Sequence, residues 1–236
     1  MNDKRLFTFG CSFTQYHWPT WADILGKSFD LHFNYGLAGA GNFYIFKTLI
    51  DAIAEHDIDQ NDTVAIMWTT FTREDRFLNG KWFTPGNVFN ALPVYDDYFL
   101  KNYCDLTLQG FYERDIPLFH AAQLLLDKIG CKHYILSLRD MYSNVEHSGD
   151  FNLKDSYLES KYKTTLDRII KPAQEDWLQQ NKKIEWRKLA GYIDGHPYPF
   201  EHLMYVQTIF KEYNITKETV EWVKTLNELA KKIPVK

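Results

Sequence analysis

The sequence is poor in the features that mark several common classes of protein. It has only three cysteines, Cys11, Cys104 and Cys131. The number is odd and no two lie at metal-ligand spacing, which argues against a disulfide framework or a zinc site. No window approaches the roughly 20 apolar residues that a transmembrane helix needs, and the first residues lack an apolar stretch of signal-peptide length. We therefore expect a soluble cytoplasmic protein without a membrane partner, a metal or a cofactor.

Clusters of basic residues are also missing. Lys and Arg number 27 against 31 Asp and Glu, which gives a formal net charge of −4 and no electrostatic footprint for nucleic acid. Aromatic residues, in contrast, make up 17% of the 236 residues. They can form an aromatic-rich core, or line a groove that binds a small molecule or a glycan. The sequence does not indicate an oligomeric state.

Apolar patterning predicts alternating strands and helices. The continuous apolar run 63–68 is typical of a central parallel strand covered on both faces. The helix expected at 42–55 begins at a capping Asn42 and turns Phe43, Phe46, Ile50 and Ile53 inward. The other elements expected early in the chain are strands at 5–9 and 31–33 and a helix at 18–27. This order predicts a doubly wound α/β domain.

Two irregular, aromatic-containing stretches interrupt this pattern, at 72–116 and 140–190. Loops at the carboxyl ends of parallel strands are where such folds bind ligands, so we expect both insertions to be functional caps within one domain, 1–236. The elements expected around them are a strand at 133–138 and helices at 117–129, 201–213 and 217–232.

Three short motifs contain residues that could carry chemistry. Ser12, in FGCSFT, directly follows the first strand, and a serine nucleophile needs a base and a group that orients the base. Asp194 and His196, in DGHP, can return to the same edge of the sheet. In NYGLAG, the backbone of Gly39 can approach a substrate carbonyl closely. The alternatives are that Ser12 caps a turn and that the other two motifs are plain turns.

Together, these motifs resemble those of the SGNH (GDSL-type) hydrolases, a family of esterases and lipases that includes carbohydrate acetylesterases. They follow the family's order over nearly the whole chain. The resemblance implies a three-layer α/β/α sandwich around a flavodoxin-like parallel sheet. It also implies Ser12 as nucleophile and first oxyanion donor, Gly39 as second donor, His196 as base and Asp194 as the residue that orients it.

The sequence departs from the family at the third motif, normally a glycine and an asparagine after the third strand. The strand at 63–68 is instead followed by TTFTR. We expect Thr70 to act as an oxyanion donor, with Thr69 and Arg73 as alternatives. Arg73 could equally bind an acidic substrate or pair with Glu74 or Asp75, which we otherwise interpret as solvated loop charges. The family's histidine also commonly lies three residues after the aspartate, whereas the step here is two.

The sequence thus predicts a serine esterase that removes an acyl group, with acetyl favoured, from a hydroxylated substrate. Flat aromatic faces in the insertions suit sugar rings as well as lipid chains. We favour a carbohydrate, and we expect Trp82 and Arg73 to contact it. Further aromatic residues of the insertions that could contact it are Phe83, Tyr95, Tyr98, Tyr103, Trp177 and Trp186. The alternative is a non-catalytic ligand- or glycan-binding protein on the same fold, in which the altered third motif marks lost chemistry.

Overall fold

The computed structural model of the chain describes residues 4–88, 107–142, 151–181, 187–189, 192–194 and 196–232, with the strands at 187–189 and 192–194 described by their backbone alone. The elements are β1 (Arg5–Gly10), α1 (Trp21–Gly26), β2 (Leu31–Gly36), α2 (Asn42–His56), β3 (Thr63–Trp68), β4 (Arg76–Leu78), β5 (Lys81–Phe83), α4 (Leu108–Ile129), β6 (Lys132–Ser137), α5 (Tyr157–Asp167), α6 (Gln174–Gln180), β7 (Arg187–Leu189), β8 (Tyr192–Asp194), α7 (Pro199–Ile209) and α8 (Lys217–Ala230).

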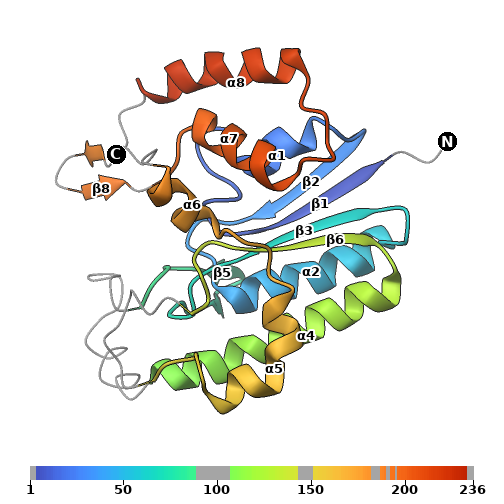
Figure 1. Cartoon of the computed structure of the whole chain (residues 1–236), viewed down its shortest axis with the longest axis vertical. Coiled ribbons are helices and arrows are strands. Elements are labelled where there is room, and N and C mark those ends of the chain that lie inside the picture. Colours follow the sequence, from blue (N-terminus) through green and yellow to red (C-terminus); the bar gives the residue numbers. More distant parts are fainter. Residues whose placement is uncertain are drawn as a thin grey trace.

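A parallel sheet with strand order β2-β1-β3-β6 forms the middle layer. Helices α1, α7 and α8 cover one face and α2, α4 and α5 the other (Figure 1). The predicted three-layer α/β/α sandwich is therefore confirmed. The order also matches the first four strands of flavodoxin-like sheets, in which the direction of winding reverses between the first and third strands. The hairpins β4–β5 and β7–β8 lie at the carboxyl ends of the parallel strands (Figure 1).

The core is built from large apolar side chains on both faces of the sheet. All six residues of β3 are buried, as expected for a central parallel strand. On one face, the Trp68 ring stacks on Phe119 of α4 with ring centroids 4.3 Å apart. In the helical layer on the other face, Trp21 of α1 stacks on Phe210, which follows α7, at 6.0 Å. Helices far apart in the sequence are thus joined to one core.

The inward face of α2 differs from the prediction. Phe43 and Ile50 are 44% and 39% exposed, and the buried residues are Asn42, Ile45, Thr48, Leu49 and Ala52. Gly41, not Asn42, is the N-cap. The Asn42 side chain is instead hydrogen-bonded to the backbone of Thr69, after β3. Because this contact turns Asn42 toward the sheet, the inward stripe follows from position 42 at helical spacing.

Helix α4 begins at Leu108, well before the expected start at 117, so Pro117 lies inside it. Thr107 is the N-cap and its side chain accepts a hydrogen bond from the backbone of Gly110. Buried residues on both sides of the proline hold the helix against the core, and this burial offsets the hydrogen bond that proline cannot donate. Part of the first irregular stretch is therefore helix.

The expectation that 140–190 is an irregular cap is also wrong in part, since it contains α5 and α6. Helix α5 packs beside α4 on the far layer (Figure 1). From the end of α5 to the first turn of α6 the chain runs along the edge strand β6. Ile170 N donates to Ile135 O (2.8 Å) and Glu175 N donates to Leu138 O (2.9 Å). This stretch therefore covers an edge of the sheet that would otherwise leave backbone groups unpaired.

Within the part of the chain that the structure describes, no helix combines the length and apolar character needed to cross a membrane.

The stack of Trp68 on Phe119 gives a prediction about stability. Phe119 is fully buried, so Phe119→Ala should lower the free energy of unfolding by about 3–5 kcal/mol. Leu124→Ala is the matched control on the same helix: Leu124 is 55% exposed, and its loss should cost less than about 1 kcal/mol. Urea unfolding measures both, and equal losses would contradict the burial described for α4.

Candidate active site

Ser12 lies in a tight turn that leaves the carboxyl end of β1. Thr14 N and Gln15 N both donate to Cys11 O, at 2.8 and 3.1 Å, which closes the turn around the serine. Gly10 is required at its start because a Cβ there would lie 2.0 Å from Thr14 Oγ1. The turn places the Ser12 hydroxyl at the carboxyl edge of the sheet, where the sequence predicted it.

His196 meets this serine from the other end of the chain. Its Nε2 lies 2.7 Å from Ser12 Oγ, a hydrogen-bond distance. The imidazole stacks on Tyr16 at 4.0 Å between ring centroids and contacts Phe13 at 5.0 Å. The expected proximity of Ser12 and His196 is thus present, and aromatic rings on two sides restrict the orientation of the histidine ring.

The aromatic residues after Ser12 hold the chain around His196 and were not predicted from sequence. Trp18 Nε1 donates to Pro197 O at 2.8 Å, and the Trp18 ring stacks on Tyr198 at 5.9 Å. The run Gln15-Tyr16-His17-Trp18 was the available signal, since aromatic residues this close to a candidate nucleophile can reach its partner. These contacts fix the backbone on both sides of the site.

Asp194 is the last residue of β8, two positions before His196. The strand pairs antiparallel with β7, and Asp194 lies opposite Arg187. Both residues therefore belong to a small hairpin and not to a fifth strand of the main sheet. The Asp194 side chain lies outside the described part of the structure, so its role in orienting His196 stays a prediction.

Gly39 has a backbone conformation that requires glycine. Its φ is +75°, and a Cβ would lie 2.0 Å from Thr84 O. Thr84 Oγ1 also donates to Ala38 O at 2.8 Å. On the other side, Leu37 N donates to Gly10 O at 3.1 Å, which joins this loop to the end of β1. The glycine loop is therefore held between the serine turn and the segment that follows β5.

Thr70 and Arg73 follow β3, the strand beside β1. Arg73 Nε donates to Thr70 Oγ1 at 3.3 Å, and Arg73 Nη1 donates to Ala40 O at 3.1 Å. Arg73 thus contacts the glycine loop and Thr70, an arrangement that sequence analysis did not foresee. Because Thr70 Oγ1 accepts a hydrogen bond from Arg73, its own hydrogen is directed elsewhere. The placing of either side chain at an oxyanion stays a prediction.

Trp82, in β5, lies over the first turns of α2. Its ring is 5.5 Å from that of Tyr44 and 6.1 Å from that of Phe43, and Lys47 Nζ lies 5.6 Å from its centre. Its predicted contact with substrate stays untested. Trp177, which was expected to line the substrate site, is instead buried in α6 against Tyr205 of α7. Tyr95, Tyr98, Tyr103 and Trp186 lie outside the described residues.

Comparison with known proteins gives matches among solved structures alone, since no family model and no curated protein matches. The chain is similar to a catalytic mutant of an acetylxylan esterase from Geobacillus stearothermophilus, with a TM-score of 0.52 and 10% identity over 90% of this chain and 95% of that chain. A second catalytic mutant of that esterase has a TM-score of 0.50 and 11% sequence identity, over 90% of this chain and 95% of that chain. A lipolytic protein of the G-D-S-L family from Veillonella parvula has a TM-score of 0.48 and 13% sequence identity, over 88% of this chain and 98% of that chain.

The chain has the SGNH (GDSL-type) hydrolase fold. The sheet order, the layers and the length of the match all agree with this assignment.

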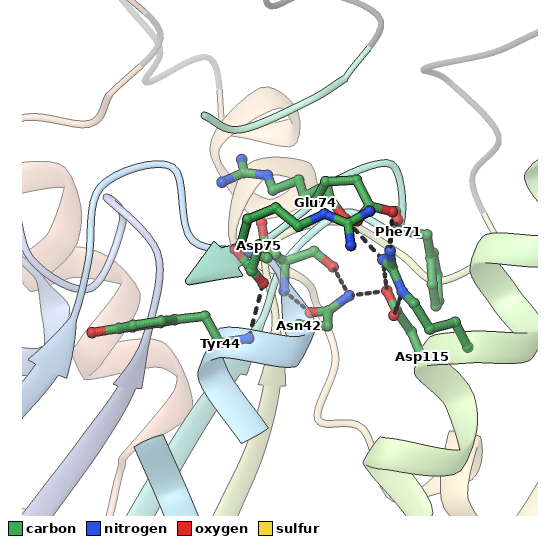
Figure 2. Close-up of polar contacts among 11 residues, drawn as sticks. Asn42, Tyr44, Phe71, Glu74, Asp75 and Asp115 are labelled. Carbon is green, nitrogen blue, oxygen red and sulfur yellow. Dashed lines mark hydrogen bonds and ion pairs between the residues drawn. The ribbon is translucent and has the colours of Figure 1, made fainter. Parts of the chain in front are cut away.

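In this SGNH fold, the segment after β3 is held by Asn42 from α2 and by charged residues from α4 (Figure 2). Asn42 Nδ2 donates to Asp115 Oδ2 at 2.8 Å, and Arg114 Nε donates to Asp115 Oδ1 at 2.6 Å. Complete burial raises the pKa of Asp115 to about 6, although Arg114 and Asn42 both favour the charged form. Asp115 thus binds the two residues, Asn42 and Arg114, that contact the loop after β3.

Glu74 and Asp75 are not solvated loop charges, which corrects the prediction. Glu74 Oε1 accepts from Arg114 Nη1 at 2.6 Å. Asp75 accepts from Gly41 N and Tyr44 N, both at 2.8 Å, and so satisfies free amides in the first turn of α2. Burial raises the pKa of Asp75, against the effect of these two amides and of nearby arginines. Both carboxylates therefore join the loop after β3 to its neighbours.

Among the residues described here, no group of three or more His, Cys, Asp or Glu is arranged to hold a metal ion.

His202 gives a prediction about pH. It is completely buried in α7, and its Nδ1 lies 2.8 Å from Nε2 of Gln174. Burial, and to a lesser extent His196, lower its pKa to about 3. Below an unfolded-state pKa of about 6.5 the unfolded chain binds a proton that the folded protein refuses, so stability should fall from there toward pH 3, by up to about 1.4 kcal/mol per pH unit.

Urea unfolding of the wild type and His202→Gln at pH 7.0, 5.5 and 4.5 measures this slope. The variant should lose less stability between pH 7.0 and 4.5, whatever its stability at pH 7.0. The exposed His17 offers a control, since His17→Gln should leave the slope as it is. Identical slopes for wild type and His202→Gln would show that burial of neutral His202 does not govern acid stability.

Proposed function

We propose that this protein is a serine esterase that removes an acyl group, in the first place acetyl, from a hydroxylated substrate. The observation that carries the proposal is the 2.7 Å separation of Ser12 Oγ and His196 Nε2. Residues far apart in the sequence meet at the edge where the fold places ligands. A serine and a histidine at this distance form the nucleophile–base pair of acyl-transfer enzymes.

In the proposed reaction, Ser12 Oγ attacks the acyl carbon while His196 Nε2 takes the hydroxyl proton. The carbonyl oxygen becomes an oxyanion, which the backbone amides of Ser12 and Gly39 and the hydroxyl of Thr70 stabilise. When the tetrahedral intermediate collapses, His196 gives its proton to the departing alcohol. Water, deprotonated by His196, then attacks the acyl carbon, and His196 returns the proton to Ser12 Oγ as the acid leaves. Asp194 orients the imidazole throughout.

A carbohydrate ester is the substrate class we favour. The structurally similar protein from Geobacillus stearothermophilus is an acetylxylan esterase, which supports an acetylated sugar here. Trp82 is half-buried, and part of its indole remains open for contact with a ring of the substrate. Arg73 contributes the positive charge of the loop after β3 and could also attract an acidic substituent.

The first test is hydrolysis of p-nitrophenyl acetate and of acetylated xylo-oligosaccharides by the purified chain. Ser12→Ala should reduce kcat by at least about 10³-fold, because no other group replaces the nucleophile. Ser160→Ala, on the exposed surface of α5, should match the wild type. Activity that survives in Ser12→Ala would exclude the proposed mechanism. An inactive wild type that still binds the oligosaccharide would instead indicate a non-catalytic binding protein.

A second test concerns Thr70 and Arg73. Thr70→Val removes the hydroxyl at nearly constant shape and should lower kcat about 10²-fold with little change in KM. Thr225→Val, on the exposed side of α8, is the control and should leave both constants unchanged. If Arg73 acts through Thr70, Arg73→Ala should lower kcat for a neutral ester. A loss confined to KM for acidic substrates would assign Arg73 to binding, and a Thr70→Val variant with normal kcat would remove Thr70 from the oxyanion site.

A further inference from the structure

The loop after β3 is held by many hydrogen bonds from two helices. Asn42 of α2 contacts both backbone groups of Thr69: Oδ1 accepts from Thr69 N at 2.9 Å and Nδ2 donates to Thr69 O at 3.3 Å. Arg114 of α4 donates through Nη2 to Phe71 O at 3.2 Å and to Arg73 O at 2.8 Å. Thr70 therefore lies between residues whose backbones are fixed on both sides.

The two helices act on the loop as one unit, because Asp115 joins them. Its Oδ2 accepts from Asn42 Nδ2 and its Oδ1 from Arg114 Nε, at 2.8 and 2.6 Å. Both Asn42 and Asp115 are fully buried, so neither group can exchange its partner for water. Figure 2 shows Asn42 bonded to Asp115, with Phe71 and Glu74 of the loop nearby.

The same loop leaves the sheet beside the serine turn. Strands β1 and β3 are paired in parallel with Phe9 opposite Ile66, so the residues that follow them leave the sheet side by side. A Cβ on Gly10 would lie 3.3 Å from Met67 O, which shows how closely the two strand ends approach. The position of Thr70 relative to Ser12 is therefore set by the backbone that Asn42 and Arg114 hold.

We propose that Asn42, Asp115 and Arg114 are positioning residues that hold the loop after β3 so that the Thr70 hydroxyl meets the oxyanion formed at Ser12. The proposal rests on the esterase function proposed above. An SGNH hydrolase commonly presents an asparagine side chain after the third strand directly to the oxyanion. In this chain an asparagine of α2 instead fixes the backbone that carries a threonine. None of the three residues needs to touch the substrate.

The hydrogen-bond pattern suggests a reciprocal exchange as the main experiment. Asn42→Asp places a carboxylate against that of Asp115, and Asp115→Asn removes one of the two carboxylates that bind Arg114, the other being Glu74. In the double variant Asn42→Asp/Asp115→Asn, the new carboxylate can accept from Thr69 N and from the amide now at position 115, whose oxygen still accepts from Arg114 Nε. The pair is restored with its polarity reversed. Thr69 O loses its donor in this variant, as it does in Asn42→Asp.

We expect each single variant to lower kcat for p-nitrophenyl acetate about 10- to 100-fold with KM within about twofold, because a displaced donor weakens the transition state more than the bound substrate. The double variant should be at least about threefold more active than Asn42→Asp, because both lack the donor to Thr69 O and only the single variant places two carboxylates together. A phenylboronic acid, which forms a tetrahedral adduct on the serine, should lose affinity in parallel with kcat.

Arg114→Lys tests the same network and leaves Asn42 and Asp115 in place. The Arg114 side chain is 30% exposed, so the substitution lies at the edge of the core. Lysine keeps the charge but cannot supply the guanidinium fork that reaches two carbonyls. It should lower kcat about tenfold with KM nearly constant. Arg168→Lys is the matched control: Arg168 is 35% exposed, forms a two-pronged ion pair with Asp127, and should leave kcat unchanged when replaced.

Three results would overturn the proposal. One is an Arg114→Lys variant with wild-type kcat, since that activity would itself show that the variant folds. Another is a double variant no more active than Asn42→Asp. In both cases the loss of activity in Ser12→Ala would leave the esterase function intact. The third is full activity in Ser12→Ala, which would overturn the esterase function and the positioning proposal together.

Discussion

The parallel pairing of β1 with β2 and β3 is the constraint on which the candidate site depends. The register runs from Arg5 opposite Leu31 to Gly10 opposite Gly36, and Phe9 lies opposite Ile66. Because parallel strands end at the same edge, the serine turn, the glycine loop and the loop after β3 all begin within one small region. A shift of register by one residue would move the side chains of a strand to the opposite face of the sheet and offset these three loops along it.

Short hydrogen bonds then connect the loops to one another. In the glycine loop, Ala40 O accepts a hydrogen bond from Arg73, and Gly41 N donates one to the Asp75 carboxylate. The amides at the start of α2 are thus satisfied by a carboxylate of the protein itself, although a helix N-terminus is a common site for a bound anion. A substrate oxyanion has to be stabilised by other donors, and this is consistent with the proposed use of Gly39 and Thr70.

The histidine reaches the site by a different route. His196 belongs to no strand of the main sheet, and aromatic contacts with the residues after Ser12 hold it in place. The bond from Trp18 to Pro197 O ties the start of the chain to the segment that precedes α7. Burial of these rings supplies the driving force, and the hydrogen bond selects one arrangement. The high aromatic content therefore serves in part to join the two ends of the chain at the site.

The amino-acid sequence alone determined the alternation of strands and helices, and the motifs around Ser12, Gly39 and His196 indicated the edge of the sheet at which they meet. These are local signals: apolar period, glycine at a positive φ, and residue type after a strand. It did not reveal that α4 continues through Pro117, that Phe43 faces outward, or that Glu74, Asp75, Asn42 and Asp115 hold the third loop. Those features depend on which distant groups a side chain finds after packing, and burial of a polar group against a specific partner has no local signature. The tertiary structure therefore decided how the loop that carries Thr70 is held.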